Sequence, residues 1–173
     1  MKHSIMKNLT LTMLLIAATG TYVSAQSIYE AKSAEEKQMD HKDSMVIAEM
    51  ITPAVNDAGQ TGQAPDWEGL RASVTVKYDD KIADRTVTKA RIYFYYGKDW
   101  STFCTAIVHY TEKYENKENL KLMDKNAKFI MKYSQDPAEW KAAEGWIRHA
   151  VEKDPSNAAY KETYEGLTAK IKG

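Results

Sequence analysis

The stretch Asp99–His109 reads DWSTFCTAIVH, and the stretch Glu139–His149, which begins forty residues later, reads EWKAAEGWIRH. In each, an acidic residue precedes a Trp, an Ile follows seven residues after that Trp, and a His follows after nine. A shorter match, DWEGL, begins at Asp66. Repeats of this length are typical of stacked helical hairpins, whose single units cannot bury their apolar faces alone. The sequence therefore predicts an all-α array of stacked antiparallel hairpins.

Apolar spacing supports helices throughout residues 66–173. In the first stretch Trp100, Phe103 and Ile107 recur at steps of three and four residues, which is the face that a helix buries. The same stripe recurs over 140–151, 83–97 and 120–134. Small residues interrupt the alternate helices, and they are expected to let a neighbouring helix approach closely: Ala90, Ala127 and Gly166. We expect about six helices after residue 66.

Residues 1–25 are typical of a signal peptide. Lys2 and Lys7 precede an apolar run from Leu9 to Ala18, and Val23-Ser24-Ala25 follows as a small-residue cleavage site. The run is too short to span a membrane, although an uncleaved anchoring helix is an alternative. Cleavage between Ala25 and Gln26 would export the protein to the periplasm or outside the cell.

The rest of the N-terminal region divides in two. Residues 26–52 carry weak helical periodicity and are expected to form an N-terminal helical segment. Residues 53–65 are rich in Pro, Gly, Asn, Asp and Gln, which predicts a linker before the repeat domain at 66–173.

One stretch carries a conflicting pattern. Residues 72–78, which include Val74–Tyr78, alternate with period two, as a strand paired with Arg91–Tyr96 would. We expect helix, because the repeat alignment places both stretches inside helical segments, and a local β-hairpin is the alternative.

Charge and cysteine content exclude several functions. The chain has 24 Lys and Arg against 24 Asp and Glu, and without residues 1–25 the acidic residues exceed the basic ones by two. Nucleic acid binding needs a basic excess, so it is not expected. After the signal peptide no stretch is long and apolar enough to span a membrane. Cys104 is the only cysteine, which rules out an internal disulfide or a Cys-x-x-Cys redox centre in this chain.

No catalytic or metal-binding pattern is evident, and no catalytic residue, metal or cofactor is predicted. His109 and His149 occupy the same repeat position, which indicates shared packing, and neither has zinc-type spacing to other ligands. Cys104 follows Phe103 on the apolar stripe and is expected to be an inert core thiol, with a reactive thiol as the alternative.

A partner-binding groove is the one site that we predict. Alignment on the small residues places Arg91 with Lys128 and Tyr95 with Lys132, and Lys170 is expected to join them. Aromatic rings beside basic side chains suit a peptide that carries carboxylates. The alternative is that the tyrosines belong to the core and the lysines to an ordinary solvated surface.

Residues Trp140, Ala143, Ala150 and Asp154–Pro155 resemble the second helix of a tetratricopeptide repeat. Ile147 stands where that family more usually has an aromatic residue, and Gly166 and Gly173 resemble the glycine positions of a following first helix. The resemblance implies a right-handed superhelix of hairpins.

Residues 66–173 are also similar to the helical region that follows thioredoxin-like domains in exported proteins of Bacteroidetes-type bacteria. The similarity rests on these residues: Asp99–Trp100, Tyr110, Glu112–Tyr114, Asn126–Ala127, Trp146 and Thr163–Tyr164. The thioredoxin-like domain and its paired cysteines are absent from this chain. The resemblance implies a non-catalytic protein that binds a protein or peptide in the cell envelope. The alternative is an accessory subunit or remnant of a thioredoxin-like redox protein.

Overall fold

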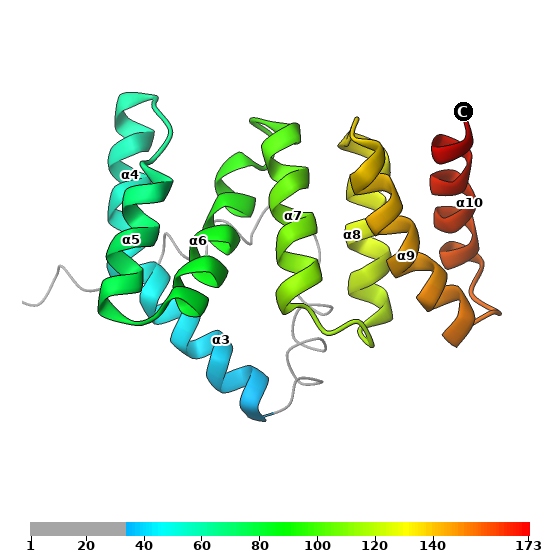
Figure 1. Cartoon of the computed structure of the whole chain (residues 1–173), viewed down its shortest axis with the longest axis horizontal. Coiled ribbons are helices and arrows are strands. Elements are labelled where there is room, and N and C mark those ends of the chain that lie inside the picture. The colour runs from blue at the N-terminus through cyan, green and yellow to red at the C-terminus, as the bar shows by residue number, and fades with distance from the viewer. Residues whose placement is uncertain (1–33) are drawn as a thin grey trace, which may run out of the picture. The chain divides into compact units, whose positions relative to one another are not determined.

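Figure 1 shows the computed structural model of the chain, which describes residues 34–173. The signal peptide predicted for residues 1–25 and the first part of the segment 26–52 lie outside the described residues. The chain divides into a unit that ends at Lys42 and a compact unit, Asp43–Gly173. Helix α3 (Ala34–Val46) begins in the first unit and ends in the second. The account below concerns the second unit.

The described part of the chain is helical and contains no strand, which confirms the all-α prediction. After residue 66 there are six helices, as expected, and each packs against the next in chain order (Figure 1). Two further elements precede them. The bounds are η1 (Ile47–Ile51), α4 (Thr52–Thr61), α5 (Trp67–Lys77), α6 (Asp80–Tyr95), α7 (Trp100–Tyr114), α8 (Leu120–Tyr133), α9 (Pro137–Lys153) and α10 (Ala158–Lys172).

Side-chain caps begin each of these six helices. Asp66 and Asp99 each precede a Trp in one of the matching stretches. Asp66 accepts a hydrogen bond from the backbone N–H of Gly69, and Asp99 accepts one from that of Thr102. The other four capping residues are Asp79, Asn119, Asp136 and Asn157. Each satisfies an N–H group that has no partner within the helix, which contributes typically about 1 kcal/mol.

The linker predicted for residues 53–65 is wrong over 53–61, because these residues belong to α4. The π-helical turn η1 precedes Pro53, and the Thr52 hydroxyl donates to the Ile47 carbonyl at 3.0 Å. Pro53 lies in the first turn of α4, where no backbone N–H is needed. Burial of Ala58 stabilises α4 despite the polar composition of this helix. Gly62 ends the helix with a left-handed backbone conformation, φ 71°.

Residues Val74–Tyr78 are helical up to Lys77, so the helix prediction is confirmed over the alternating stretch. Val74 is fully buried whereas Val76 is 89% exposed, although both fit the period-two pattern. Helix α5 buries Trp67 and Val74, a spacing of seven residues that fits two helical turns. Residues 91–95, the other half of the alternative hairpin, lie in α6.

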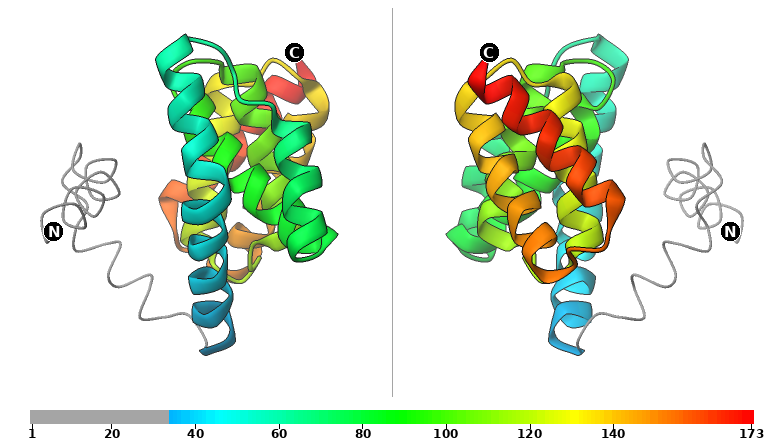
Figure 2. Two further views of the ribbon diagram at one scale, coloured as in Figure 1. Left: turned by 90° about the vertical axis from the view of Figure 1, so that its left-hand side faces the viewer. Right: turned by 90° about the vertical axis from the view of Figure 1, so that its right-hand side faces the viewer.

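Two groups of buried residues form the core. The larger joins α7–α10 around Phe103, Met123 and Ile147, and the smaller joins η1, α5 and α6 around Val74 and Val87. Tyr95 of α6 packs against both groups. The right-hand view of Figure 2 shows α10, in red, covering the C-terminal end.

The small residues act as expected at the helix contacts. Ala127 is fully buried and Ala90 nearly so. At Gly166 of α10 a Cβ atom would lie 2.6 Å from the sulfur of Met131 in α8. The Met131 side chain therefore packs over Gly166, and a larger residue at this position would displace it.

The acid–Trp pairs differ in structural role despite their sequence match. Asp99 caps α7, whereas Glu139 lies inside α9, which begins at Pro137. Glu139 is buried and accepts hydrogen bonds from the hydroxyls of Thr105 at 2.7 Å and Ser134 at 2.6 Å. Its carboxylate therefore joins α9 to α7 and to the end of α8.

A buried ion pair anchors the start of this unit to α6. Arg85 Nε and Nη2 donate to the two carboxylate oxygens of Asp43 at 2.7 and 2.5 Å, and both side chains are almost fully buried. The hydrogen bonds that Arg85 donates to Asp43 raise the pKa of Arg85, although burial acts to lower it. This two-point geometry is the strongest form of the pair.

We predict that Arg85→Met will lower the free energy of unfolding by about 3–5 kcal/mol, because it leaves the Asp43 carboxylate buried and unpaired. The double variant Asp43→Leu with Arg85→Met should recover most of this loss, since no buried charge remains. Urea unfolding of the single and double variants measures both changes. Arg148→Met, which removes an exposed ion pair with Glu144, is the control and should change stability by less than about 1 kcal/mol. Equal losses in the single and double variants would contradict this account.

Candidate functional site

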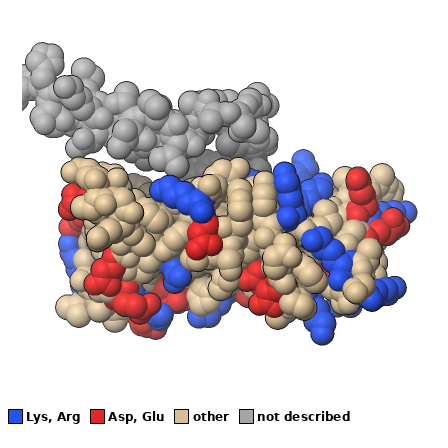
Figure 3. All heavy atoms as spheres, turned by 90° about the horizontal axis from the view of Figure 1, so that it is seen from above, with Lys and Arg blue, Asp and Glu red and all other residues tan. Residues whose placement is uncertain are grey.

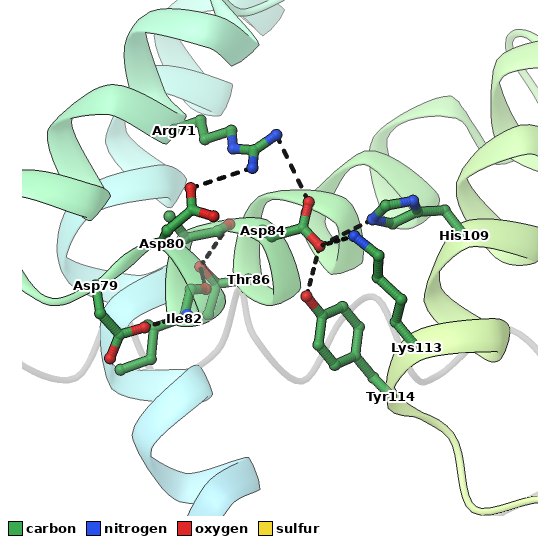
Figure 4. Close-up of polar contacts among 10 residues, drawn as sticks. Arg71, Asp79, Asp80, Ile82, Asp84, Thr86, His109, Lys113 and Tyr114 are labelled. Carbon is green, nitrogen blue, oxygen red and sulfur yellow. Dashed lines mark hydrogen bonds and ion pairs between the residues drawn. The ribbon is translucent and has the colours of Figure 1, made fainter.

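The densest group of charged side chains surrounds Asp84 of α6 (Figure 4). Its Oδ2 atom accepts a hydrogen bond from the Tyr114 hydroxyl at 2.5 Å and lies 2.9 Å from His109 Nε2. Lys113 Nζ donates to the same oxygen at 3.2 Å, and the Arg71 guanidinium lies 3.7 Å from Oδ1. Side chains of α5 and α7 therefore converge on a carboxylate that is only 9% exposed. We call these five residues the Asp84 cluster.

Asp84 and Tyr114 each keep one protonation state near neutral pH. Burial raises the pKa of Asp84, but the hydrogen bonds from Tyr114, His109 and Lys113 outweigh burial and lower this pKa from 3.8 to about 2. Burial and the hydrogen bond to Asp84 raise the pKa of Tyr114. Asp84 is therefore ionised and Tyr114 protonated at pH 7. This arrangement suits structural charge pairing rather than proton transfer, which needs a pKa near the working pH.

A cavity of about 160 Å³ lies beside the Asp84 cluster, between α5, α6 and α7. Arg71, Asp84 and His109 are among its lining residues, and Arg91 of α6 completes its charged wall. The Nε atom of Arg91 is buried and has no hydrogen-bond partner among the described residues. We call this space the Arg91 cavity.

A second, larger hollow of about 450 Å³ lies between α7, α8 and α9. Its lining includes the buried Met123, the ring of Trp146, and Gly145, whose missing side chain leaves open space. The Trp146 indole N–H donates to Glu112, and Lys117 Nζ lies 5.5 Å from the centre of the Trp146 ring. We call this space the Trp146 hollow.

The repeated helix face lines both spaces. Thr105, Ala106 and His109 of α7 border the Arg91 cavity, and the residues forty positions later border the Trp146 hollow: Gly145, Trp146 and His149 of α9. The two histidines also have related surroundings. His109 Nε2 contacts Asp84, and His149 Nε2 lies 3.1 Å from Glu118, which precedes α8. The sequence match thus corresponds to a shared structural position.

The predicted groove residues have separate partners. Tyr95 accepts a hydrogen bond from the Trp67 indole at 2.9 Å and packs against the core, which fits the core alternative for this tyrosine. Lys128 pairs with Asp124 one turn away at 2.7 Å. Lys132 and Lys170 each lie 5.0 Å from an aromatic ring, those of Tyr133 and Trp140. Arg91 lines the Arg91 cavity, and Lys128, Lys132 and Lys170 do not.

Sequence reasoning missed Asp84, Arg71 and Tyr114. The periodicity correctly predicted the helix that carries Asp84. It did not show that neighbours on other helices bury this carboxylate. Tyr114 continues the stripe of Trp100, Phe103 and Ile107 and belongs to the thioredoxin-associated resemblance, but neither pattern indicates a contact with Asp84. The repeated histidine was the one signal that led toward the Asp84 cluster.

Charges of both signs are interspersed on the face seen in Figure 3, so this face carries no large field of one sign. No group of three or more metal-ligating side chains occurs within residues 34–173. In the same residues, no helix has the length and apolar character needed to cross a bilayer.

Cys104 is fully buried in the larger core. Burial, with a smaller contribution from the charge of Glu139, raises the pKa of its thiol to about 12. The thiolate is the reactive species, so Cys104 is poorly placed for redox chemistry in the folded protein.

We predict that neutralising Asp84 removes an acid-sensitive contribution to stability. The folded pKa of about 2 lies below 3.8, so the stabilisation is complete above about pH 4 and is lost as the pH falls toward 2. Asp84→Asn should therefore lower the free energy of unfolding by about 2 kcal/mol at pH 7 and flatten its dependence between pH 4 and 2. Chemical unfolding at several pH values tests this. Asp57→Asn, which removes an exposed carboxylate, is the control, and a similar change in both variants would contradict the role of Asp84.

We also predict slow labelling of Cys104 by a thiol reagent at pH 8. Reaction should proceed at the rate at which the fold opens and should accelerate at least a hundredfold in denaturing urea. Mass spectrometry of the modified chain over time measures this rate. Labelling of the folded chain as fast as that of a free thiol would show that Cys104 is accessible and reactive.

No family model matches this chain, and no curated protein or solved structure shows significant similarity to it.

Proposed function

We propose that this chain is an exported, non-catalytic helical-repeat protein that binds a protein or peptide partner in the cell envelope. Export is inferred from the signal peptide expected at residues 1–25. The tetratricopeptide resemblance and the similarity to regions that follow thioredoxin-like domains are part of the same proposal.

The observation that carries the proposal is the pair of recesses on one repeated helix face. The Arg91 cavity and the Trp146 hollow are bordered by residues of α7 and α9 at matching repeat positions. Repeat proteins present extended binding surfaces in this manner, because each unit adds an equivalent patch. An extended peptide could place side chains in both recesses.

The chemistry of the Trp146 hollow also supports binding. Ala142 and the Trp146 ring, which is only 5% exposed, supply its apolar lining, while Lys117, Lys141 and Glu112 supply charges. A ligand site combines apolar walls with polar groups that fix the orientation of the ligand. The charged residues of the Asp84 cluster are paired with one another, which favours a structural over a catalytic role for them.

The alternative, an accessory subunit or remnant of a thioredoxin-like redox protein, assigns the chemistry to a partner. Cys104 does not favour a direct redox role, because it is buried and its pKa is raised. A non-catalytic binding role is compatible with either partner, a thioredoxin-like enzyme or another envelope protein.

A space-filling variant tests the proposal. Gly145 lies in α9, and no heavy atom of a neighbour would lie within 4 Å of an added Cβ. Gly145→Leu should therefore project a side chain into the Trp146 hollow, and it removes a helical glycine that is unfavourable by about 1 kcal/mol. Peptides are first selected from a random display library on the immobilised chain and then titrated in solution. We expect Gly145→Leu to weaken their binding at least tenfold.

Gly59→Leu is the matched control, because Gly59 lies in α4 and likewise has open space at its Cβ position. Its peptide affinity should stay within twofold of the unchanged chain. Failure to select any peptide, or equal affinity of the two variants, would contradict binding at the Trp146 hollow.

A further inference from the structure

Arg91 lines the Arg91 cavity, and one donor of its guanidinium is left without an acceptor among the described residues. Arg91 Nε is buried and has no hydrogen-bond partner among the described residues. A buried donor without an acceptor is unfavourable, and more so when the group is charged. A ligand that brings an acceptor to the Arg91 guanidinium would remove that penalty.

Asp84 and Arg71, two of the charged residues that line the cavity, already have partners. Asp84 is paired with His109, Lys113 and Tyr114, and its second oxygen lies near Arg71. Arg71 also donates to Asp80 at 3.1 Å. The Asp84 carboxylate is thus committed to other groups, and Arg91 is left to receive an outside acceptor.

The size and walls of the cavity restrict the acceptor. A volume of about 160 Å³ holds roughly five water-sized groups of about 30 Å³ each. A carboxylate with two methylene groups has five non-hydrogen atoms, and the side chains of Val87 and Ala106 offer apolar wall to the methylenes. Glu68 and Asp84 also line the cavity, and their charges disfavour a dianion such as phosphate.

We infer that the Arg91 cavity binds a carboxylate on a short aliphatic stem, received by the Arg91 guanidinium. The planar guanidinium matches a carboxylate through two parallel hydrogen bonds. A glutamate side chain of a peptide and a free short-chain carboxylic acid share this chemistry. The peptide source rests on the proposed function, whereas the carboxylate site does not.

Nuclear magnetic resonance of the full chain tests the inference directly. The probes are the blocked tripeptide acetyl-Ala-Glu-Ala-amide, the same peptide with Gln in place of Glu, and butyrate. We expect the Glu peptide to shift the Arg91 Nε–H signal saturably, with an affinity at least tenfold higher than that of the Gln peptide. A higher affinity for the Glu peptide than for butyrate assigns the site to peptides. Saturable binding of butyrate alone supports the carboxylate site and assigns it to free acids.

Variants show whether Arg91 is the receiving group. Arg91→Lys keeps the positive charge but loses the planar fork, and it should weaken carboxylate binding at least tenfold. Lys128→Gln removes a charge that is paired with Asp124 outside the cavity, and its affinity should stay within twofold. Circular dichroism reports whether each variant remains folded, and the Arg91 signal of the unchanged chain gives a result that depends on no variant.

The inference is overturned if no probe shifts the Arg91 signal, if Glu and Gln peptides bind equally, or if folded Arg91→Lys binds as the unchanged chain does. These results are distinct from failure of the proposed function. Display-selected peptides that bind in a Gly145-sensitive manner, with a silent Arg91, would retain the function and reject the carboxylate site.

Discussion

The arrangement of this unit depends on the requirement that buried charges on α6 be paired. Residues 82–88 of α6 are all buried, and they include two adjacent ions, Asp84 and Arg85. Neighbouring residues on a helix point in different directions, so the two ions need partners from different elements. Arg85 finds Asp43, and Asp84 finds side chains from α5 and α7. An uncompensated buried charge is strongly unfavourable, so these elements have few alternative positions around α6.

Apolar packing then extends the stack away from α6. Tyr95, near the end of that helix, packs against both core groups and thus connects the charged half of the unit to the repeats. Beyond it, aromatic contacts continue, since the Trp100 ring stacks on Tyr133 at 3.6 Å between centres. The Met131 side chain of α8 packs over Gly166 of α10. Polar pairing therefore positions the first helices, and shape and apolar burial position the later ones.

Periodicity predicted the helices because the stripe of each helix is a local property of the sequence. Composition, rather than periodicity, assigned 53–61 to a linker, because the Pro, Gly and polar residues do not reveal that α4 follows a π-helical turn and buries Ala58. Alignment on the small residues placed Arg91 at a binding surface, but it grouped Arg91 with lysines that have partners of their own. The Asp84 cluster escaped notice because its members come from three helices. Which polar residues become buried depends on tertiary contacts that no local pattern records.

The repeated histidine shows how sequence likeness and site chemistry separate. The same helix face carries Thr105 and Ala106 in one copy and Gly145 and Trp146 in the other. In α7 the small side chains of Thr105 and Ala106 border the charged wall of the Arg91 cavity. In α9 the glycine and the indole border the larger Trp146 hollow. Duplication of a packing position thus preserves the histidine contact to a carboxylate but not the character of the neighbouring space. A partner that spans both recesses would have to present a hydrogen-bond acceptor to the Arg91 cavity and apolar surface to the Trp146 hollow. This difference would fix the direction in which the partner binds.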